Sequence, residues 1–153
     1  MSRLEHLIPP PLVALLIALA MLALAKASGP PAIDEALRVD GASLLFVLGL
    51  GCAALGALAF QRQGANINPH KLDRGDVLVT SGVFHWTRNP MYLGLTLLLC
   101  CYAFYLARPL SVLGPIVFVP FITRFQIIPE ERAMLAKFGE RFADYCGKTR
   151  RWI

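Results

Sequence analysis

Charged residues are scarce in this sequence, and they are absent from three long stretches of it. Asp, Glu, Lys and Arg make up 16% of the 153 residues and hydrophobic residues 56%, against about 25% and about 45–50% in soluble domains. Residues 7–25, 41–60 and 89–107 contain no charged side chain, and residues 109–129 contain one, Arg124. This composition excludes an ordinary soluble domain.

The length of these runs predicts a membrane protein. A helix rises about 1.5 Å per residue, so about 20 residues cross a hydrocarbon core about 30 Å thick. We therefore predict an all-α, polytopic membrane protein that forms a single domain over residues 1–153, with a cytoplasmic tail over residues 129–153. Its four transmembrane helices are expected over residues 7–27, 41–60, 89–107 and 109–128.

The first apolar run has a second interpretation, as a signal peptide. "PLVALLIALAMLALAKAS" follows a lone Arg3, and Ala25-Lys26-Ala27 is similar to a cleavage site. The prolines at positions 9 to 11, however, suit the start of an interfacial helix better than a short signal-peptide n-region. We therefore expect the run to be retained as a span.

The sequence also lacks the cysteine spacing of metal sites. Its four cysteines include no CxxC pair and no other zinc-site spacing. Three of them lie inside apolar runs, where cysteine usually packs as a small apolar side chain. We expect neither a metal site nor disulfides.

Basic residues are distributed unequally between the two sides of the predicted bundle. Eleven lie before the first span, between the second and third, or after the fourth, whereas the opposite loops hold three, Lys26, Arg38 and Arg108. Because Lys and Arg are enriched in cytoplasmic loops, we expect both termini in the cytoplasm and the protein in an inner or plasma membrane. Anionic lipid headgroups account for the net charge of +5, so no nucleic-acid partner is implied.

Small residues and prolines predict how the spans pack. Gly49, Ala53 and Ala57 form a stripe at four-residue spacing, which lets two helices approach closely. Gly114-Pro115 and Pro120 predict a kinked or broken fourth span, because an interior proline removes a helical hydrogen bond.

Two further segments mix polar and apolar residues. Residues 61–90 are too polar to cross a membrane but contain several large apolar side chains, so we expect them to lie at the interface, half tucked against the bundle. The tail begins with Pro129 at a probable first helical position. It then carries an apolar stripe at helical spacing, which predicts an amphipathic cytoplasmic helix ending in "RRWI". The stripe is formed by Leu135, Phe138, Phe142 and Tyr145.

Arg124 is the one charged residue of the fourth run, and ionisable residues in spans are functional candidates. It lies seven residues before Glu131, about two helical turns, so the two side chains share a face if the helix continues. The alternative is an arginine whose head group reaches back to the membrane interface. The polar segment before the third span, the end of the fourth and the acidic start of the tail all belong to the same predicted face, which favours a site there.

Two motifs carry a resemblance to a known family. "LVTSGVFHWTRNPMYLG" is followed, after two spans, by "PEERAMLAKFGERFADYCGKTRRWI". Together they resemble the integral-membrane isoprenylcysteine carboxyl methyltransferase and phospholipid methyltransferase superfamily, whose signature is R-[HN]-P-x-Y-x-G and a later Glu-Glu pair. The resemblance covers about residues 66–153; the first two spans match only in being hydrophobic.

The resemblance implies methyl transfer from S-adenosyl-L-methionine, bound between the last two spans and the tail helix. It implies catalytic roles for Arg124, which would orient an anionic acceptor in competition with Gln126, and for Glu130. The customary histidine of the motif is Asn89 here, which weakens any scheme that uses this position as a base. The implied cofactor-binding residues are Val77, Leu78, Val79, Phe84, Asn89, Pro90, Met91, Tyr92, Glu130 and Glu131.

These residue types suit the cofactor's chemistry. Asn89 as N-cap and Pro90 at the first helical position would leave backbone N–H groups that can hold a carboxylate, and the rings of Phe84 and Tyr92 can lie against adenine or a sulfonium. The plainer interpretations are a simple cap and interfacial aromatics.

The sequence thus predicts a methyltransferase that acts on a lipophilic or small membrane-accessible acceptor, a carboxylate, thiol or amine, with the lipid bilayer as its surroundings. The alternatives are a non-catalytic four-helix membrane scaffold and a small transporter. Nothing in the sequence chooses the acceptor or the oligomeric state.

Overall fold

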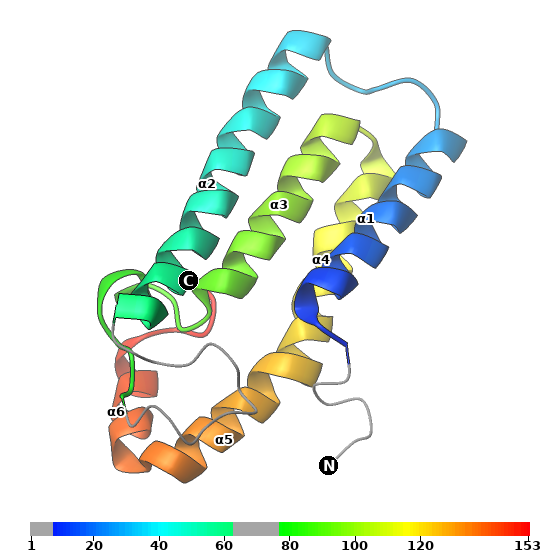
Figure 1. The fold of residues 1–153 in the computed structure, drawn as a ribbon. Helices are drawn as coiled ribbons and strands as arrows, with labels where there is room; N and C mark the ends of the chain where they lie inside the picture. The colour runs from blue at the N-terminus through cyan, green and yellow to red at the C-terminus, as the bar shows by residue number, and fades with distance from the viewer. Residues whose placement is uncertain (1–7, 63–76) are drawn as a thin grey trace.

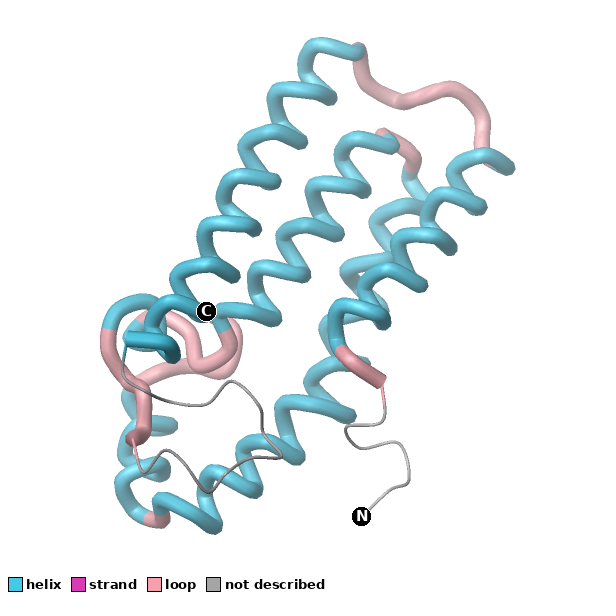
Figure 2. The backbone as a smooth tube through the Cα atoms, viewed as in Figure 1, coloured by secondary structure: helices cyan, strands magenta, loops and turns pink. Residues whose placement is uncertain are grey.

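The computed structural model describes residues 8–62 and 77–153, and all regular structure in these two ranges is helical. Figure 1 shows α3 between α2 on one side and α1 and α4 on the other, with α5 and α6 beyond one end of this bundle. Figure 2 shows the same path with loops confined to the connections. The helices are α1 (Pro10–Ala27), α2 (Glu35–Arg62), η1 (Gly82–His85), α3 (Pro90–Leu106), η2 (Pro109–Val112), α4 (Leu113–Ile122), η3 (Thr123–Ile127), α5 (Ile128–Phe138) and α6 (Glu140–Lys148).

The helices confirm an all-α membrane protein. By length and composition, three helical stretches can cross a membrane: Pro10–Ala27, Glu35–Arg62 and Pro109–Phe138. The fourth predicted span, Pro90–Leu106, is a shorter apolar helix of 17 residues, at the lower end of the range of about 17–25 that spans a bilayer. Residues 8–62 and 77–153 therefore hold three to four helices that are long and apolar enough to span a membrane.

Large apolar side chains on the outside of the bundle fit a lipid environment. Leu44 and Val47 of α2 are 62% and 66% exposed, and Leu15 and Leu19 of α1 are each 55% exposed. Such surfaces are unfavourable in water but face acyl chains at no cost in a bilayer. The sparse burial along α2 is thus what a helix at the edge of a membrane bundle requires.

Helices α2 and α3 approach each other closely where both carry small residues. A Cβ atom added to Gly94 of α3 would lie 2.7 Å from the Cβ of Ala53 and 2.7 Å from the carbonyl oxygen of Gly49. This confirms Gly49 and Ala53 of the predicted stripe as a packing surface. One turn further along α2, the glycine that touches α3 is Gly56, which faces Pro90.

The other packing centre lies between α1, α3 and α4. Met21, Leu99, Phe118 and Ile122 belong to one buried apolar cluster, and Phe118 and Ile122 have no exposed surface. Gly114 admits the side chain of Met21, since a Cβ atom there would collide with the methionine sulfur. This glycine therefore joins α4 to α1 and is not a break in the fourth span.

The fourth span departs from α-helical geometry later than the prolines predicted. α4 continues through Pro115 and Pro120, and the departure is a π-helical turn, η3, over Thr123–Ile127. Pro129 follows at the start of α5. Proline cannot donate to the carbonyl four residues earlier and its ring collides with it, so a wider turn just before Pro129 relieves that conflict.

The tail consists of two helices where the sequence predicted one. α5 ends at Phe138, Gly139 follows with φ +55°, and α6 begins at Glu140. Phe142 and Tyr145 of the predicted apolar stripe are buried, but Leu135 is 50% exposed. The glycine turns the chain and Leu135 stays outside, whereas Phe138 still packs against the cluster that contains Phe142 and Tyr145.

We expect Gly94→Ala to destabilise the protein by about 1–3 kcal/mol, the usual cost of overpacking, because the new methyl group would force α2 and α3 apart. The free energy of unfolding in detergent micelles is the measurement. The matched control is Gly51→Ala, since a Cβ atom at Gly51 has nothing within 4 Å. Equal stability of the two variants would contradict the close approach.

Candidate functional site

The two sequence motifs meet at one end of the bundle. The segment before α3 and the first turn of α3 lie beside the start of α5 and the last residues of the chain; in Figure 1 the C-terminus is marked next to the start of α3. Hydrogen bonds join residues 84–92 to residues 130–131 and 145–151. This end is also where the sequence predicts the cofactor.

Tyr92 and Glu130 form a direct pair across the two helices. The Tyr92 hydroxyl donates to Oε1 of Glu130 over 2.6 Å. Among the described residues, Glu130 accepts this one hydrogen bond from a side chain. Its second oxygen, Oε2, can therefore accept a hydrogen bond from a ligand. The structure therefore brings together the tyrosine of the first motif and the first glutamate of the second.

Glu131 is the centre of an ion-pair cluster. Its Oε1 accepts from the Arg88 guanidinium at 2.8 Å and from Arg151 Nε at 3.1 Å, and its Oε2 accepts from Arg151 at 2.6 Å. The side chains of Arg88 and Glu131 are 12% and 19% exposed. The bond to Glu131 raises the pKa of Arg151, as expected for a cation whose charged form is hydrogen-bonded to a carboxylate.

Arg88 also holds the end of the chain. Its guanidinium donates to the carbonyl oxygens of Cys146 at 3.0 Å and Thr149 at 2.7 Å, and its backbone N–H donates to the carbonyl of Arg150 at 3.0 Å. These carbonyls belong to the end of α6 and the residues after it, where helices leave acceptors without partners. The Nε of Arg88 is buried without a hydrogen-bond partner in the described chain. Arg88 thus docks the C-terminal segment onto the start of α3.

Asn89 occupies the N-cap position of α3 but does not cap it with its side chain. Its amide nitrogen donates to the carbonyl of Arg151 at 2.9 Å, and no side-chain cap hydrogen bond is formed. Its backbone N–H donates to Thr87 Oγ1 at 3.2 Å. The structure thus confirms Asn89 at the N-cap with Pro90 at the start of α3, but the Asn89 amide holds the C-terminal segment instead of capping the helix.

Phe84 and Val79 are packed inside the protein. Both are 4% exposed and share a cluster with Phe142 and Tyr145. The Phe84 ring also lies edge-on to Phe60 of α2, with centroids 5.1 Å apart. These contacts confirm, for residues 77–89, a segment half tucked against the bundle; the part of that prediction at positions 63–76 lies outside the described residues. Of the other residues named there, Val77 is exposed and Leu78 is partly buried.

Tyr145 fixes the position of α6. Its hydroxyl donates to the backbone carbonyl of Phe84 over 2.6 Å, and burial raises the pKa of Tyr145 to about 12. The hydroxyl therefore stays protonated and keeps donating at physiological pH. The sequence pattern predicts this tyrosine as part of the apolar stripe, and the structure adds the hydrogen bond to Phe84.

The structure does not place Arg124 on the face of Glu131. Arg124 is exposed and its guanidinium lies 5.6 Å from the centroid of the Phe125 ring, whereas the cations that pair with Glu131 are Arg88 and Arg151. The π-helical turn explains the difference, because its wider winding shifts the register between positions 124 and 131. Gln126 is buried and donates to the carbonyl of Ile8 at 2.9 Å.

Two residues at this end, Arg88 and Arg151, were not predicted as site residues from the sequence. In the sequence, both arginines contribute only to the excess of basic residues that predicts the orientation in the membrane. A signal was present, since a Glu-Glu pair needs counter-charges when it is drawn against a bundle, and Arg88 is the first residue of the motif. Nothing in the sequence spacing indicates that Arg151, 20 residues after Glu131, folds back to it.

Glu131→Gln should destabilise the protein by about 1–3 kcal/mol, between the values for exposed and buried ion pairs, because it leaves Arg88 without its counter-charge. The measurement is the free energy of unfolding in detergent micelles. Asp144→Asn on the exposed face of α6 is the control for loss of an acid. If both variants unfold alike, the cluster does not hold the tail.

Comparison with known proteins bears on this arrangement. The sequence pattern of the family described as "Phospholipid methyltransferase" matches residues 37–141. An uncharacterized protein of Haemophilus influenzae is 41% identical over 63 residues, which is 41% of this chain and the whole of that protein. No solved structure matches. The family match covers more than half of the sequence, from α2 to the start of α6, so this chain belongs to the phospholipid methyltransferase family, a family of membrane methyltransferases.

Proposed function

We propose that the protein transfers a methyl group from S-adenosyl-L-methionine to a lipophilic or small membrane-accessible acceptor, at the end of the bundle where α3 begins. The observation that carries this proposal is the Tyr92–Glu130 pair, which joins the two family motifs by a hydrogen bond of 2.6 Å. Family membership supports methyl transfer; the cofactor, the acceptor and the residue roles are our inference.

The side chains at this end fit the chemistry of that cofactor. S-adenosylmethionine carries hydroxyl and ammonium donors, a carboxylate, an adenine and a sulfonium. Glu130 retains an acceptor oxygen for a donor group. Arg88 is the cation of the first motif, and its buried Nε has no hydrogen-bond partner among the described residues. A site with one acidic side chain, Glu130, and one basic side chain, Arg88, suits the zwitterionic amino-acid part of the cofactor.

Each implied residue then has a defined part. Glu130 accepts from a ribose hydroxyl or the ammonium group, and Tyr92 fixes the carboxylate of Glu130 and offers its ring face to a cation. Pro90 and Met91 form the first turn of α3, whose N–H groups favour an anionic group. Val79 and Phe84 are both buried and support the site by packing beneath it. Glu131 holds Arg88 and Arg151 in place.

Positioning accounts for the chemistry expected of the protein. The bound cofactor supplies a methyl group that its sulfonium already activates. What remains is to hold the acceptor in line with that methyl group, and such orientation lowers a barrier by up to about 7–11 kcal/mol in favourable cases. Asn89 cannot take up a proton, so an acceptor that is already a carboxylate or thiolate fits this site without a dedicated base.

The acceptor is expected to come from the membrane. The family's description names phospholipids, and the apolar exterior of the bundle faces acyl chains. Arg124 is exposed in the turn that precedes α5, where a cation can attract an anionic head group. We place this end of the bundle, with both termini, on the cytoplasmic side, following the distribution of basic residues.

Glu130→Gln and Tyr92→Phe should each weaken binding of S-adenosylhomocysteine by about 10–100-fold, the loss expected when a hydrogen bond to a charged group is removed. Isothermal titration of the detergent-solubilised protein measures the dissociation constants. Tyr102→Phe, in the middle of α3, is the control and should bind normally. Normal binding by both test variants would show that the site lies elsewhere.

A wild-type protein that binds no S-adenosylhomocysteine at millimolar concentration would overturn the proposal as a whole. Transfer of a labelled methyl group to a lipid extract and to a panel of small thiols distinguishes enzyme from scaffold. Tight cofactor binding with no transfer to any acceptor would favour a non-catalytic membrane scaffold.

Arg124→Gln should raise the KM for an anionic acceptor more than it raises the dissociation constant of the cofactor, because Arg124 lies apart from the Glu131 cluster. Steady-state kinetics with the acceptor varied at saturating cofactor measures the first quantity, and titration the second. Arg132→Gln on the exposed part of α5 is the matched control. A cofactor affinity that falls as much as the acceptor KM rises would assign Arg124 to cofactor binding.

A further inference from the structure

Three basic side chains line one cavity at the opposite end of the bundle. Lys26 at the end of α1, Arg38 near the start of α2 and Arg108 just after α3 surround a space of about 180 Å³. Tyr105 and Leu106 of α3 complete its wall. Three helix ends therefore bring all the basic residues of this side of the protein to one place.

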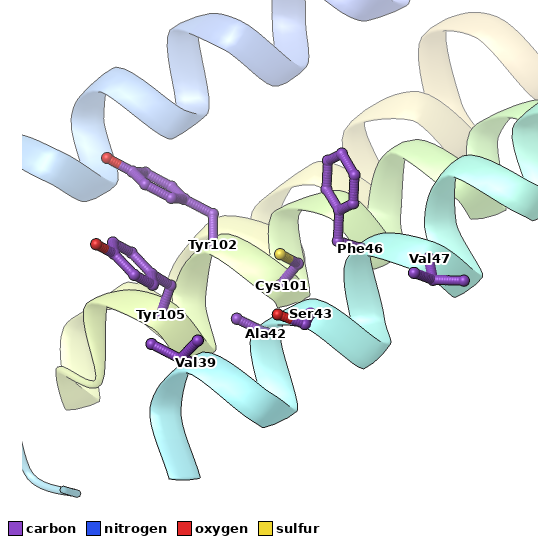
Figure 3. Close-up of a pocket in the computed structure, with 8 residues that line it drawn as sticks. All are labelled: Val39, Ala42, Ser43, Phe46, Val47, Cys101, Tyr102 and Tyr105. Atoms are coloured by element: carbon purple, nitrogen blue, oxygen red, sulfur yellow. The ribbon is translucent and has the colours of Figure 1, made fainter. Parts of the chain in front are cut away.

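An apolar groove continues from this cavity along the membrane-facing surface. Its volume is about 310 Å³, and it lies between α2 and α3, with Val39, Phe46 and Tyr102 among the side chains that line it. Figure 3 shows these side chains on the facing sides of the two helices. Tyr105 lines both the groove and the basic cavity, so the two spaces share a wall.

The cations of the cavity have unused capacity. The Nε of Arg38 is buried without a hydrogen-bond partner, and its guanidinium lies 5.3 Å from the centroid of the Tyr105 ring. Arg108 donates one hydrogen bond, to the carbonyl of Ser28 at 3.2 Å. Within residues 8–62 and 77–153, no carboxylate forms an ion pair with any of the three, and the neighbouring Asp34 accepts from the backbone N–H of Leu37.

We propose that this end of the protein binds an anionic phospholipid, with the phosphate in the basic cavity and an acyl chain in the groove. Cations that form no ion pair among the described residues keep donors for an anion, and at a membrane surface each basic residue favours anionic lipid. The adjoining groove is apolar and opens to the bilayer, which suits an acyl chain and not a soluble anion. The ligand therefore carries both a phosphate and a long apolar chain.

This site is separate from the proposed methyl-transfer site. The two lie at opposite ends of α3, which runs from Pro90 to Leu106, a distance of about 24 Å at about 1.5 Å per residue. A lipid held here lies in the leaflet remote from Tyr92 and Glu130, so its phosphate stands far from the proposed reacting groups. Its binding is independent of whether the protein transfers methyl groups.

The experiment measures lipid affinity by native mass spectrometry of the full-length protein in detergent. The probes are dioleoyl-phosphatidylglycerol, dioleoyl-phosphatidylcholine, glycerol 3-phosphate and inorganic phosphate. We expect phosphatidylglycerol to bind most tightly, and Arg38→Gln/Arg108→Gln to weaken it about 25-fold, at about fivefold for each cation removed. Arg141→Gln/Lys148→Gln on the exposed face of α6 removes the same charge and should leave this affinity unchanged.

Other outcomes of these affinity measurements would contradict the proposed lipid site or test it further. Equal binding of phosphatidylglycerol and phosphatidylcholine, or equal losses in the two double variants, would overturn the proposal. Binding of glycerol 3-phosphate or inorganic phosphate as tight as that of the lipid would identify a soluble anion as the ligand instead. If the Arg38/Arg108 variant does not fold, Lys26→Gln at an exposed position should still weaken phosphatidylglycerol about fivefold, and an unchanged affinity would contradict the site.

Discussion

The carboxylate of Glu131 is the contact on which this end of the protein depends. It accepts from Arg88, just before α3, and from Arg151, near the end of the chain. A carboxylate drawn against a bundle is costly unless it is paired, so both arginines must be in place for α5 to begin where it does. Arg88, the first residue of the motif, also supplies donors for the carbonyls at the end of α6.

The two residues of the Glu-Glu pair have different roles: Glu131 stabilises the structure, and Glu130 serves the proposed chemistry. Glu131 is paired with two guanidinium groups and holds the tail, whereas the side-chain hydrogen bond to Glu130 among the described residues comes from Tyr92, which leaves its second oxygen for a ligand. The first motif is divided in the same way. Arg88 and the amide of Asn89 dock the C-terminal segment, while Tyr92 faces Glu130. Much of what looks like a binding motif in sequence is therefore the anchor of the last eight residues.

The sequence predicted the helices well because a membrane limits the choices: charge-free runs of about 20 residues leave only helical spans, and small residues such as Gly49 and Ala53 mark close packing. It failed where geometry depends on distant residues. Arg124 and Glu131 were placed on one face by assuming α-helical winding, and the turn before Pro129 is wider. The pairing of Arg151 with Glu131 depends on the bend at Gly139, and no periodicity records such a return.

The wide turn at Thr123–Ile127 can be understood as one residue more than an α-helix needs to cover the same rise. Removing a single residue there would restore regular winding and rotate everything that follows by about 100°. Glu130 and Glu131 would then leave Tyr92 and Arg88 together, and Gln126 would lose the carbonyl of Ile8. The length of this segment, and not only its chemistry, sets where the acids point, so substitutions within it are far easier to accommodate than a deletion.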